Sequence, residues 1–277
     1  MLKNLLFREY QYRILLNPLI LYGSKFIGQE LSEIKREIPI IVSLCSKEEN
    51  LRETEIALYS LFTQSILPNK IILWLDNELQ LADLPYEITR LIKYGLDIRF
   101  TNDIFFTSTI NTLKEFSNSI VVTASDNIFY PKDWLEKLYH SYISNPQDIH
   151  AHLTKQIKTT ELKILPYKTW KKNPEESSKY ENFFILESGV LFPPKCFIDE
   201  VFRKDIYTKI SSLNLWLWFM AVLSNKKIRV VKNHQQCLTV INIFNKKYTV
   251  VENYDDQIET ILNYYKHNIF YKLNLHL

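Results

Sequence analysis

The sequence predicts an α/β fold with a mostly parallel sheet flanked by helices, and three observations lead to this class. Short apolar runs alternate with helical patterns over residues 38–145. The runs contain β-branched residues and end in polar ones, as buried strands of parallel sheets do. The chain has 277 residues, of which 46% are hydrophobic and 23% charged, so it is long enough to bury a substantial core.

Four strand and helix units follow one another in this region. Strands are expected at residues 38–45, 70–75, 97–101 and 119–124. Helical spacing follows each of them: from Ser46 until Pro68, over 88–94, over 109–116, and from Pro131 to Asn145. Ser46 and Glu49 have the S-x-x-E spacing of a capping box, which predicts that Ser46 caps the first helix.

The second part of the chain has a less regular pattern. Strands are expected at 150–157, 183–192 and 227–231, a polar mobile loop at 159–180, a buried helix at 213–223 and an amphipathic helix from Tyr254. His150 and His152 would share one strand face, where a structural role is expected. We divide the chain into an N-terminal basic amphipathic extension (1–37), one main domain (38–235) and a C-terminal strand and helix packing on it (236–277).

Composition excludes several classes of function. Lys and Arg number 34 against 31 acidic residues, which is too balanced for a nucleic-acid binder. The 4 glycines lack the spacing of a dinucleotide-binding fingerprint or a P-loop. The 3 cysteines are far apart, so neither a disulfide framework nor a thiolate zinc site is expected, and the cytoplasm is the natural compartment.

The start of the chain leaves two interpretations open. The apolar stretch at residues 14–22 contains Asn17 and Pro18 and is far shorter than the roughly 20 residues that a bilayer span needs. Residues 1–25 combine basic residues with leucines and aromatics. They either pack on the chain's own domain or make a peripheral membrane contact as a basic amphipathic helix.

Polar side chains follow the ends of three predicted strands. Ser46 follows the first strand, Asp76 the second, and Ser125, Asp126 and Asn127 the fourth. In parallel α/β sheets, ligands bind at the carboxyl ends of the strands. These residues are therefore the candidate binding residues.

Five segments of the chain resemble bacterial nucleotide-sugar glycosyltransferases of the GT-A fold. They are IIVSLCSKEENL, SLFTQSILPNKIILWL, IVVTASDNIFYPKDWLEKLYHSYISNP, GVLFPP, and LWLWFMAVL with KIRVVKN. The resemblance covers roughly residues 38–260. It implies a Rossmann-like nucleotide half plus an acceptor half, and the transfer of a hexose from a nucleotide-sugar donor, such as a UDP-sugar, to a glycan or lipid-linked acceptor. Such enzymes build surface polysaccharide or lipopolysaccharide.

The resemblance also implies roles for particular residues. Asp76 would bind the nucleotide base, and Asp126 would lie near the diphosphate, where the family has a D-x-D cluster. A divalent cation (Mn or Mg) would be held by Asp126, Asn127 and His234. Ser46 is a helix cap or a phosphate ligand, since free N–H groups at a helix start suit phosphate.

A replacement base is needed because the family's acidic pair before the buried helix is Leu213 and Asn214 here. Glu187 is the candidate, because it precedes Ser188 and Gly189 in a region where acceptors bind in this fold.

Other departures from the family pattern leave the activity open. The arginine expected near Asn50 and the lysine near Ser108 or Thr109 are missing. One hypothesis is therefore a glycosyltransferase, and the alternative is a catalytically inactive glycosyltransferase-like protein that binds a glycan, a nucleotide or a partner. A third is metal-independent transfer, in which Lys168, Lys171 and Lys172 replace the metal.

Overall fold

The protein is described by a computed structural model that covers residues 30–161, 163–172, 177–231, 238–241 and 253–273. The expectations for residues 1–25 and for His234 fall outside these ranges. Within them the fold is α/β, with a large, mainly parallel sheet flanked by helices, which confirms the predicted class.

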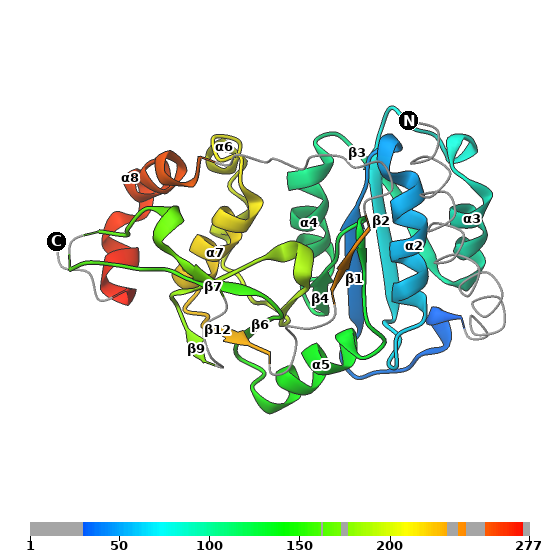
Figure 1. Ribbon diagram of the computed structural model, residues 1–277, viewed down its shortest axis with the longest axis horizontal. Coiled ribbons are helices and arrows are strands. Elements are labelled where there is room, and N and C mark those ends of the chain that lie inside the picture. Colours follow the sequence, from blue (N-terminus) through cyan, green and yellow to red (C-terminus); the bar gives the residue numbers. More distant parts are fainter. Residues whose placement is uncertain (1–29, 162, 173–176, 232–237, 242–252, 274–277) are drawn as a thin grey trace, which may run out of the picture.

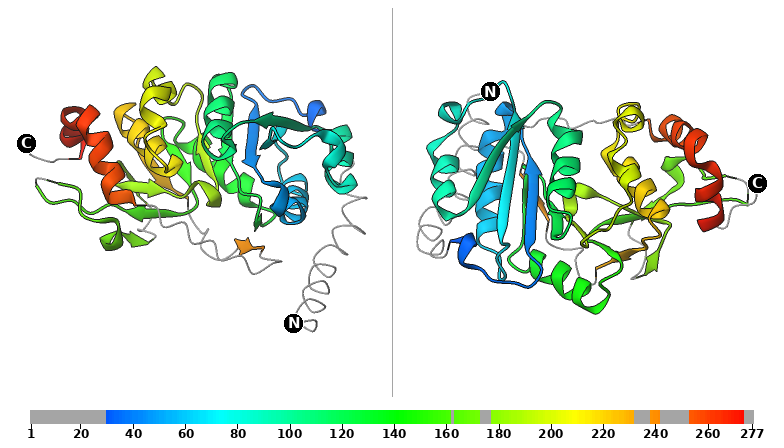
Figure 2. Two further views of the ribbon diagram at one scale, coloured as in Figure 1. Left: turned by 90° about the horizontal axis from the view of Figure 1, so that it is seen from above. Right: turned by 180° about the vertical axis from the view of Figure 1, so that it is seen from behind.

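The first half of the sheet is entirely parallel and has the order β3-β2-β1-β4. Its strands are β1 (Ile40–Cys45), β2 (Lys70–Asp76), β3 (Leu96–Thr101) and β4 (Ile120–Thr123). The helices of this half are α2 (Leu51–Phe62), α3 (Tyr86–Thr89), α4 (Ile104–Glu115) and α5 (Trp134–Ser144). Helices α2 and α3 cover one face of these strands and α4 covers the other (Figures 1 and 2).

The second half of the sheet is mixed. It continues from β4 with the strands β11 (Val190–Phe192), β6 (Ile149–Ala151), β12 (Ile228–Val230) and β9 (Ser178–Lys179). Strand β11 runs antiparallel to both of its neighbours, β4 and β6. A separate sheet contains β10 (Asn182–Phe184), β7 (Thr154–Gln156) and β8 (Lys171–Lys172).

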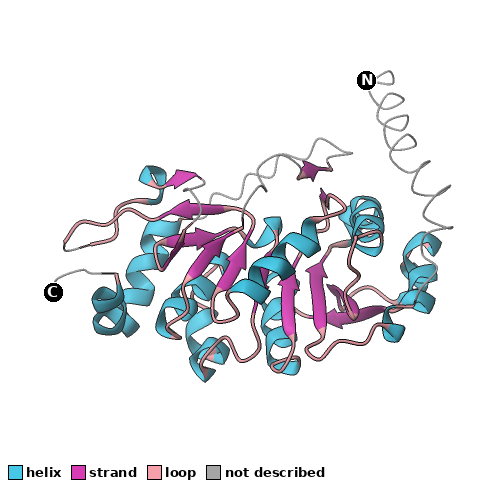
Figure 3. Cartoon of the chain, turned by 90° about the horizontal axis from the view of Figure 1, so that it is seen from below, coloured by secondary structure: helices cyan, strands magenta, loops and turns pink. Residues whose placement is uncertain are grey.

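The remaining elements surround these two sheets (Figure 3). The helices are α6 (Lys204–Tyr207), α7 (Leu213–Leu223) and α8 (Tyr254–Lys272). A two-stranded ladder joins β5 (Ile128–Phe129) to β13 (Thr239–Val240). The 3-10 turns are η1 (Leu31–Glu33), η2 (Glu48–Asn50), η3 (Leu81–Asp83), η4 (Arg90–Tyr94), η5 (Tyr167–Thr169), η6 (Leu186–Ser188) and η7 (Asp199–Phe202).

Strand β1 forms where predicted because both of its faces are covered. Ile40, Val42 and Leu44 pack in the core that contains α2, while Ile41 packs with Trp74 on the opposite face. The one polar residue in the middle of the strand, Ser43, shares a hydrogen bond of 2.9 Å with the Thr112 hydroxyl of α4. A buried hydroxyl with a partner costs little, so the strand stays a continuous buried run.

Helix α7 is also confirmed, with the bounds expected from its apolar sequence. Trp216 and Trp218 are fully buried in it. Their ring N–H groups donate to the backbone oxygens of Val201 (3.0 Å) and Tyr180 (2.8 Å). Both tryptophans are therefore core residues with satisfied polar atoms.

The structure differs from the expected elements in several places. Residues 150–157 form β6 and β7 in different sheets, and residues 183–192 are divided between β10, η6 and β11. Helix α4 begins at Ile104, earlier than the expected residue 109. The expected loop at 159–180 carries β8, β9 and the buried Trp170. The errors in the strands arise because pairing partners distant in sequence decide where short strands begin and end.

Candidate functional site

The strand order of the sheet reverses between β1 and β4. The chain moves from β1 outward through β2 to β3, and then returns to the other side of β1 to form β4. β1 and β4 are parallel neighbours, with Ser43 opposite Thr123. The connections that follow β1 and β4 leave the sheet in opposite directions, which opens a crevice at the carboxyl ends of these two strands. α/β proteins bind ligands in such a crevice.

Asp126 lies at this crevice and is held by residues that follow β1. Its Oδ2 accepts a hydrogen bond from the Ser46 hydroxyl (2.8 Å) and another from the Asn50 side-chain amide (3.0 Å). Ser46 also contacts the Thr54 hydroxyl of α2 at 2.6 Å. Only 9% of Asp126 is exposed. The carboxylate is therefore fixed in position across the strand reversal.

The predicted capping role of Ser46 is wrong. No side chain caps η2, whose N-cap is Lys47, or α2, whose N-cap is Asn50. Ser46 still belongs to the sheet, because its N–H donates to the backbone oxygen of Trp74 (2.9 Å). The Ser46 hydroxyl donates to the Asp126 carboxylate (2.8 Å) and also lies 3.2 Å from the backbone oxygen of Lys47.

The two neighbours of Asp126 form a tight turn after β4. The Ser125 hydroxyl donates to Oδ1 of Asn127 at 2.8 Å, and the Ser125 N–H donates to the Tyr130 hydroxyl at 2.6 Å. The backbone oxygen of Asn127 accepts from the N–H of Ile241 (2.6 Å), next to β13. Residues near the C-terminal end of the chain therefore border the candidate site.

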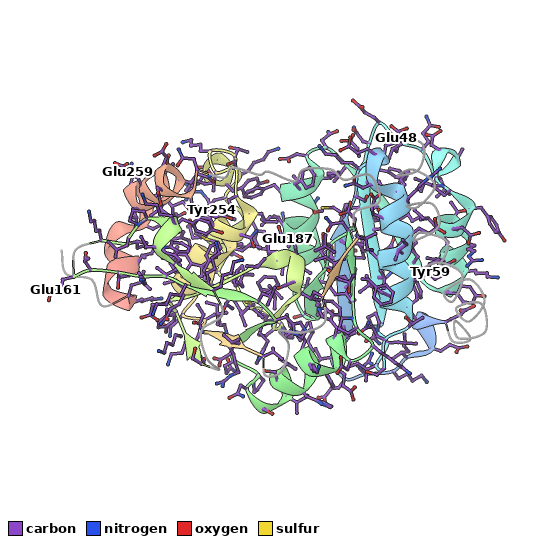
Figure 4. The ribbon with its side chains drawn as sticks, viewed as in Figure 1. Glu48, Tyr59, Glu161, Glu187, Tyr254 and Glu259 are labelled. Carbon is purple, nitrogen blue, oxygen red and sulfur yellow. The ribbon has the colours of Figure 1, made fainter. Side chains whose placement is uncertain are left out.

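Glu187 reaches the same edge of the sheet because β11 is antiparallel to β4. The start of an antiparallel strand lies beside the end of its neighbour, so the turn η6 before β11 adjoins the loop after β4. Glu187 is exposed, and Figure 4 shows it in the middle of the molecule.

Four side chains fix the backbone of this turn. Tyr130 donates to the backbone oxygen of Glu187 (2.8 Å), Trp134 to that of Ser188 (2.9 Å) and Thr123 to that of Leu186 (2.9 Å). The Oδ1 of Asn214, at the start of α7, accepts from the Leu186 N–H (2.8 Å). The turn ahead of β11 is thus tied to β4, α5 and α7.

Gly189 completes the turn, at a position where the backbone and the packing both disfavour a residue with a Cβ atom. Its φ of +106° lies in the region that favours glycine, and a Cβ at this position would approach Nε1 of Trp134 to 2.5 Å. The close approach of Trp134 is what lets its ring N–H reach the backbone of Ser188.

The pKa values of two buried groups, Cys45 and Tyr130, are raised in the same direction by Asp126 and Glu187. Burial, followed by the negative charges of Asp126 and Glu187, raises the pKa of the Cys45 thiol to about 12. Burial and the same two carboxylates also raise the pKa of the Tyr130 hydroxyl. The Tyr130 hydroxyl is thus protonated at neutral pH, as its donated bond to Glu187 requires.

Asp76 is the last residue of β2 and lies on the same edge of the sheet. Its Oδ1 accepts the N–H of Glu78 at 3.1 Å, so it forms an Asx turn with the two residues that follow. Asp76 remains partly exposed. Its second oxygen has no hydrogen bond within the described part of the chain.

The predicted metal ligands are brought together only in part. Asp126 and Asn127 adjoin, but Oδ2 of Asp126 and Oδ1 of Asn127 already accept hydrogen bonds. The described residues contain no cluster of three or more His, Cys, Asp or Glu side chains that suits a metal ion. Mg²⁺ in nucleotide sites is held by one or two carboxylates together with water and phosphate oxygens. The described residues offer one carboxylate here, with Oδ2 already accepting two hydrogen bonds, so this donor set does not fit a divalent cation well. The contribution of His234 stays a prediction.

The lysines expected to replace a metal belong to another part of the fold. Lys171 and Lys172 form β8, which pairs with β7 in the separate sheet. Glu161, from the same segment, lies at the α8 end of the molecule, away from Glu187 (Figure 4). Strands β1 and β4, which precede Ser46 and Asp126, belong to the large sheet and not to this one.

Sequence reasoning missed three residues that organise the site. The sequence pattern singles out Asn50 only for lacking an arginine, but the Asn50 amide donates to Asp126. Asn214 was noted as a missing acid, yet it holds the Glu187 turn. Tyr130 lies inside a resembling segment but gave no signal, because its two polar contacts join it to Ser125 and to residue 187, far along the chain.

Comparisons with known proteins give a similarity to solved structures but no family match. No protein-family model matches the chain, and no curated protein matches it. The chain is similar to a crystal structure of S. aureus TarS 1-349, with 14% sequence identity and a TM-score of 0.49. The similarity covers 73% of this chain and 59% of that one, so the chain spans less than two thirds of TarS 1-349.

A search of the described residues for membrane spans found no helix with the length and apolar character needed to cross a bilayer.

Proposed function

We propose that this chain is a glycosyltransferase that transfers a hexose from a nucleotide-sugar donor to a glycan or lipid-linked acceptor, in the synthesis of surface polysaccharide or lipopolysaccharide. The observation that carries the proposal is the Ser46 to Asp126 hydrogen bond across the strand reversal between β1 and β4. It places a fixed carboxylate where doubly wound sheets bind nucleotides. The resemblance of five sequence segments to GT-A enzymes supports the same assignment.

The donor is assigned to the edge formed by β1, β2 and β4. Asp76, at the end of β2, has a carboxylate oxygen suited to accept N–H groups of the base, and a uracil base presents one. Asp126 adjoins the diphosphate and orients the donor through Ser46 and Asn50, which it holds at 2.8 Å and 3.0 Å. A UDP-hexose is the donor that we propose.

Glu187 is assigned as the base for the acceptor. In a direct displacement, the acceptor oxygen forms a bond to the anomeric carbon while the bond from that carbon to the phosphate oxygen breaks. The acceptor proton passes to Glu187, and the nucleoside diphosphate leaves with the bonding electron pair. Support comes from the exposure of Glu187 and from the side chains that fix its turn beside Asp126.

The cellular setting follows from the same proposal. Nucleotide sugars are cytoplasmic metabolites, so we propose that the chain acts in the cytoplasm, with residues 1–25 making peripheral contact with the inner face of the membrane. Lys3, Arg8, Arg13 and Lys25 supply the positive charge that anionic lipids attract. Nucleic acid is not a proposed partner.

The experiment that tests the proposal measures donor turnover. The wild-type chain is incubated with UDP-glucose, UDP-galactose and UDP-N-acetylglucosamine, and released UDP is measured with and without a lipid-linked glycan fraction. We expect release that is stimulated by acceptor and reduced at least about 100-fold by Asp126→Ala. Asp133→Ala, a change of the same size at the N-cap of α5, is the control. Full turnover by Asp126→Ala would contradict the assignment.

A catalytically inactive, nucleotide- or glycan-binding protein is the second candidate, and one observation favours it. Asn214 occupies the place of an acid, and its amide oxygen is used to accept the Leu186 N–H. An amide cannot take a proton at neutral pH. If wild-type protein binds a UDP-sugar without releasing UDP under any acceptor condition, this second function replaces the first.

A further inference from the structure

We infer that Lys47 supplies the positive charge that neutralises the donor's diphosphate, in place of a divalent cation, and that Phe105 positions it. This inference rests on the proposed function. It concerns what compensates the charge of a nucleoside diphosphate at a site where the described oxygen ligands do not fit a metal ion.

The position of Lys47 follows from the sheet. It is the residue after Ser46, whose hydroxyl holds Asp126. Its backbone is extended, with φ of −100° and ψ of 160°, and its oxygen accepts the N–H of Asn50 (2.9 Å). The side chain is exposed, and its neighbour Glu48 lies at the outer surface where α2 begins (Figure 4). Lys47 is therefore fixed at its backbone and accessible at its ammonium group.

Lys47 differs in its partners from Lys70 and Arg99, two other cations of this half of the sheet. Lys70 is paired with Asp97 at 3.2 Å, and Arg99 is paired with both Asp97 and Glu115. Within the described residues, no carboxylate lies within ion-pair distance of Lys47. Its Nζ instead lies 4.8 Å from the centre of the Phe105 ring. The Lys47 ammonium therefore faces an aromatic ring and has no carboxylate partner within the described residues.

Phe105 is an exposed aromatic residue in the first turn of α4. It is 56% exposed, although a phenyl ring gains free energy from burial. The ring follows β3, Lys47 follows β1, and β2 lies between these strands in the sheet order. Helix α4 packs against β1, where its Thr112 hydroxyl shares a hydrogen bond of 2.9 Å with Ser43, and its first turn brings Phe105 to Lys47.

In this arrangement, different residues bind the base and the phosphates of a nucleoside diphosphate. The end of β2 offers an acceptor for the base, and the residue after β1 offers an ammonium for the phosphates. An ammonium forms charge-assisted hydrogen bonds with phosphate oxygens. A cation–π contact leaves the positive charge of the ammonium in place, because the ring carries no net charge. The ammonium can therefore still attract an anion. The leaving diphosphate is stabilised by the same ammonium, so Lys47 serves both binding and the departure of UDP.

The test compares ligands that differ only in phosphate. Isothermal titration calorimetry measures the affinities of the full chain for UDP and uridine in EDTA. We expect Lys47→Gln to weaken UDP binding roughly 10-fold or more and to change uridine binding by less than about twofold. Phe105→Leu should weaken UDP binding about two- to fivefold. Lys70→Gln is the matched control, because it removes the same charge at the opposite end of β2.

Ionic strength provides a second readout. Wild-type affinity for UDP should fall as salt rises, and Lys47→Gln should show a smaller fall. Equal UDP affinity of Lys47→Gln and wild type would overturn the inference and leave the proposed function standing. UDP binding that requires manganese and disappears in EDTA would also overturn it. Failure of the wild type to bind UDP, GDP or ADP in EDTA or with manganese would instead reject the proposed function.

Discussion

The Ser46 hydroxyl lies 2.8 Å from Oδ2 of Asp126, although the two residues are 80 positions apart in the sequence. Ser46 follows β1 and Asp126 follows β4, so the bond joins the two loops that leave the point of strand reversal. A second donor, the Asn50 amide, reaches the same oxygen at 3.0 Å. The candidate site is therefore built into the fold and does not depend on one loop.

Loss of the Asp126 carboxylate should reduce stability as well as ligand binding. Asp126→Ala leaves the Ser46 and Asn50 donors without this acceptor, at a cost of about 1–3 kcal/mol in the free energy of unfolding. Urea unfolding measures the difference. The control Asp133→Ala breaks only an exposed pair with Lys137 and should cost less than about 1 kcal/mol. Equal unfolding midpoints for the two variants would contradict the hydrogen-bonding role of Asp126.

The Tyr130 hydroxyl should matter for the position of Glu187. Tyr130→Phe keeps the ring beside Trp134, 4.3 Å between centroids, but removes the contacts to Ser125 and to the backbone of residue 187. We expect a stability loss of about 1–3 kcal/mol and a fall in kcat larger than any change in donor KM. Tyr86→Phe, at a side chain 73% exposed, is the control. Unchanged stability and kcat would exclude this positioning role.

Gly189→Ala tests the close packing of the same turn. The substitution places a Cβ against Trp134 in a backbone conformation with φ of +106°. We expect the free energy of unfolding to fall by at least about 2 kcal/mol, from strain and overpacking together. Thermal unfolding checks this, with Asn118→Ala at an exposed position as the control. A melting temperature equal to that of the control would show that the turn relaxes without cost.

The buried His150 should make stability depend on pH. Burial lowers its pKa from 6.5 to about 4, although the hydrogen bond to the backbone oxygen of Asn145 (3.1 Å) opposes this shift. Because the unfolded chain binds the proton first as pH falls, stability should decline from about pH 6.5 down to about pH 4. Protonation of His150 should lower the free energy of unfolding by about 3 kcal/mol over this pH range.

Urea unfolding at several pH values measures the decline. A His150→Gln variant should lack this part of it, whereas His140→Gln, at an exposed side chain, should behave as the wild type. The same pH dependence in the wild type and His150→Gln would show that His150 is not the group responsible.

Much of the fold could be predicted because its buried runs carry local signals. β1, β2 and β4 are continuous apolar strands, and α7 is apolar nearly all round. Short strands could not be placed in this way. β6, β10 and β11 have three residues each, and their ends depend on partners in distant parts of the chain.

The candidate site could be predicted in position but not in its contacts. Ser46, Asp76 and Asp126 were found because they follow strands, which is a topological rule. The turn of Glu187 depends on Tyr130 and Asn214, which lie 57 and 28 positions from the backbone groups they bind. The capping-box spacing of Ser46 misled, because no side chain caps η2 or α2 and the Ser46 hydroxyl binds a carboxylate that lies 80 positions away in the sequence.

Calorimetric titration of the wild type and Asp126→Ala with UDP-glucose, UDP-galactose, UDP-N-acetylglucosamine and UDP tests the central claim most directly. The proposed site predicts that the wild type binds UDP and at least one UDP-hexose. Binding should be lost or at least about 10-fold weaker in Asp126→Ala, while the far-ultraviolet circular dichroism stays unchanged. Absence of binding by the wild type, or equal binding by the folded variant, would contradict a nucleotide-sugar site at Asp126.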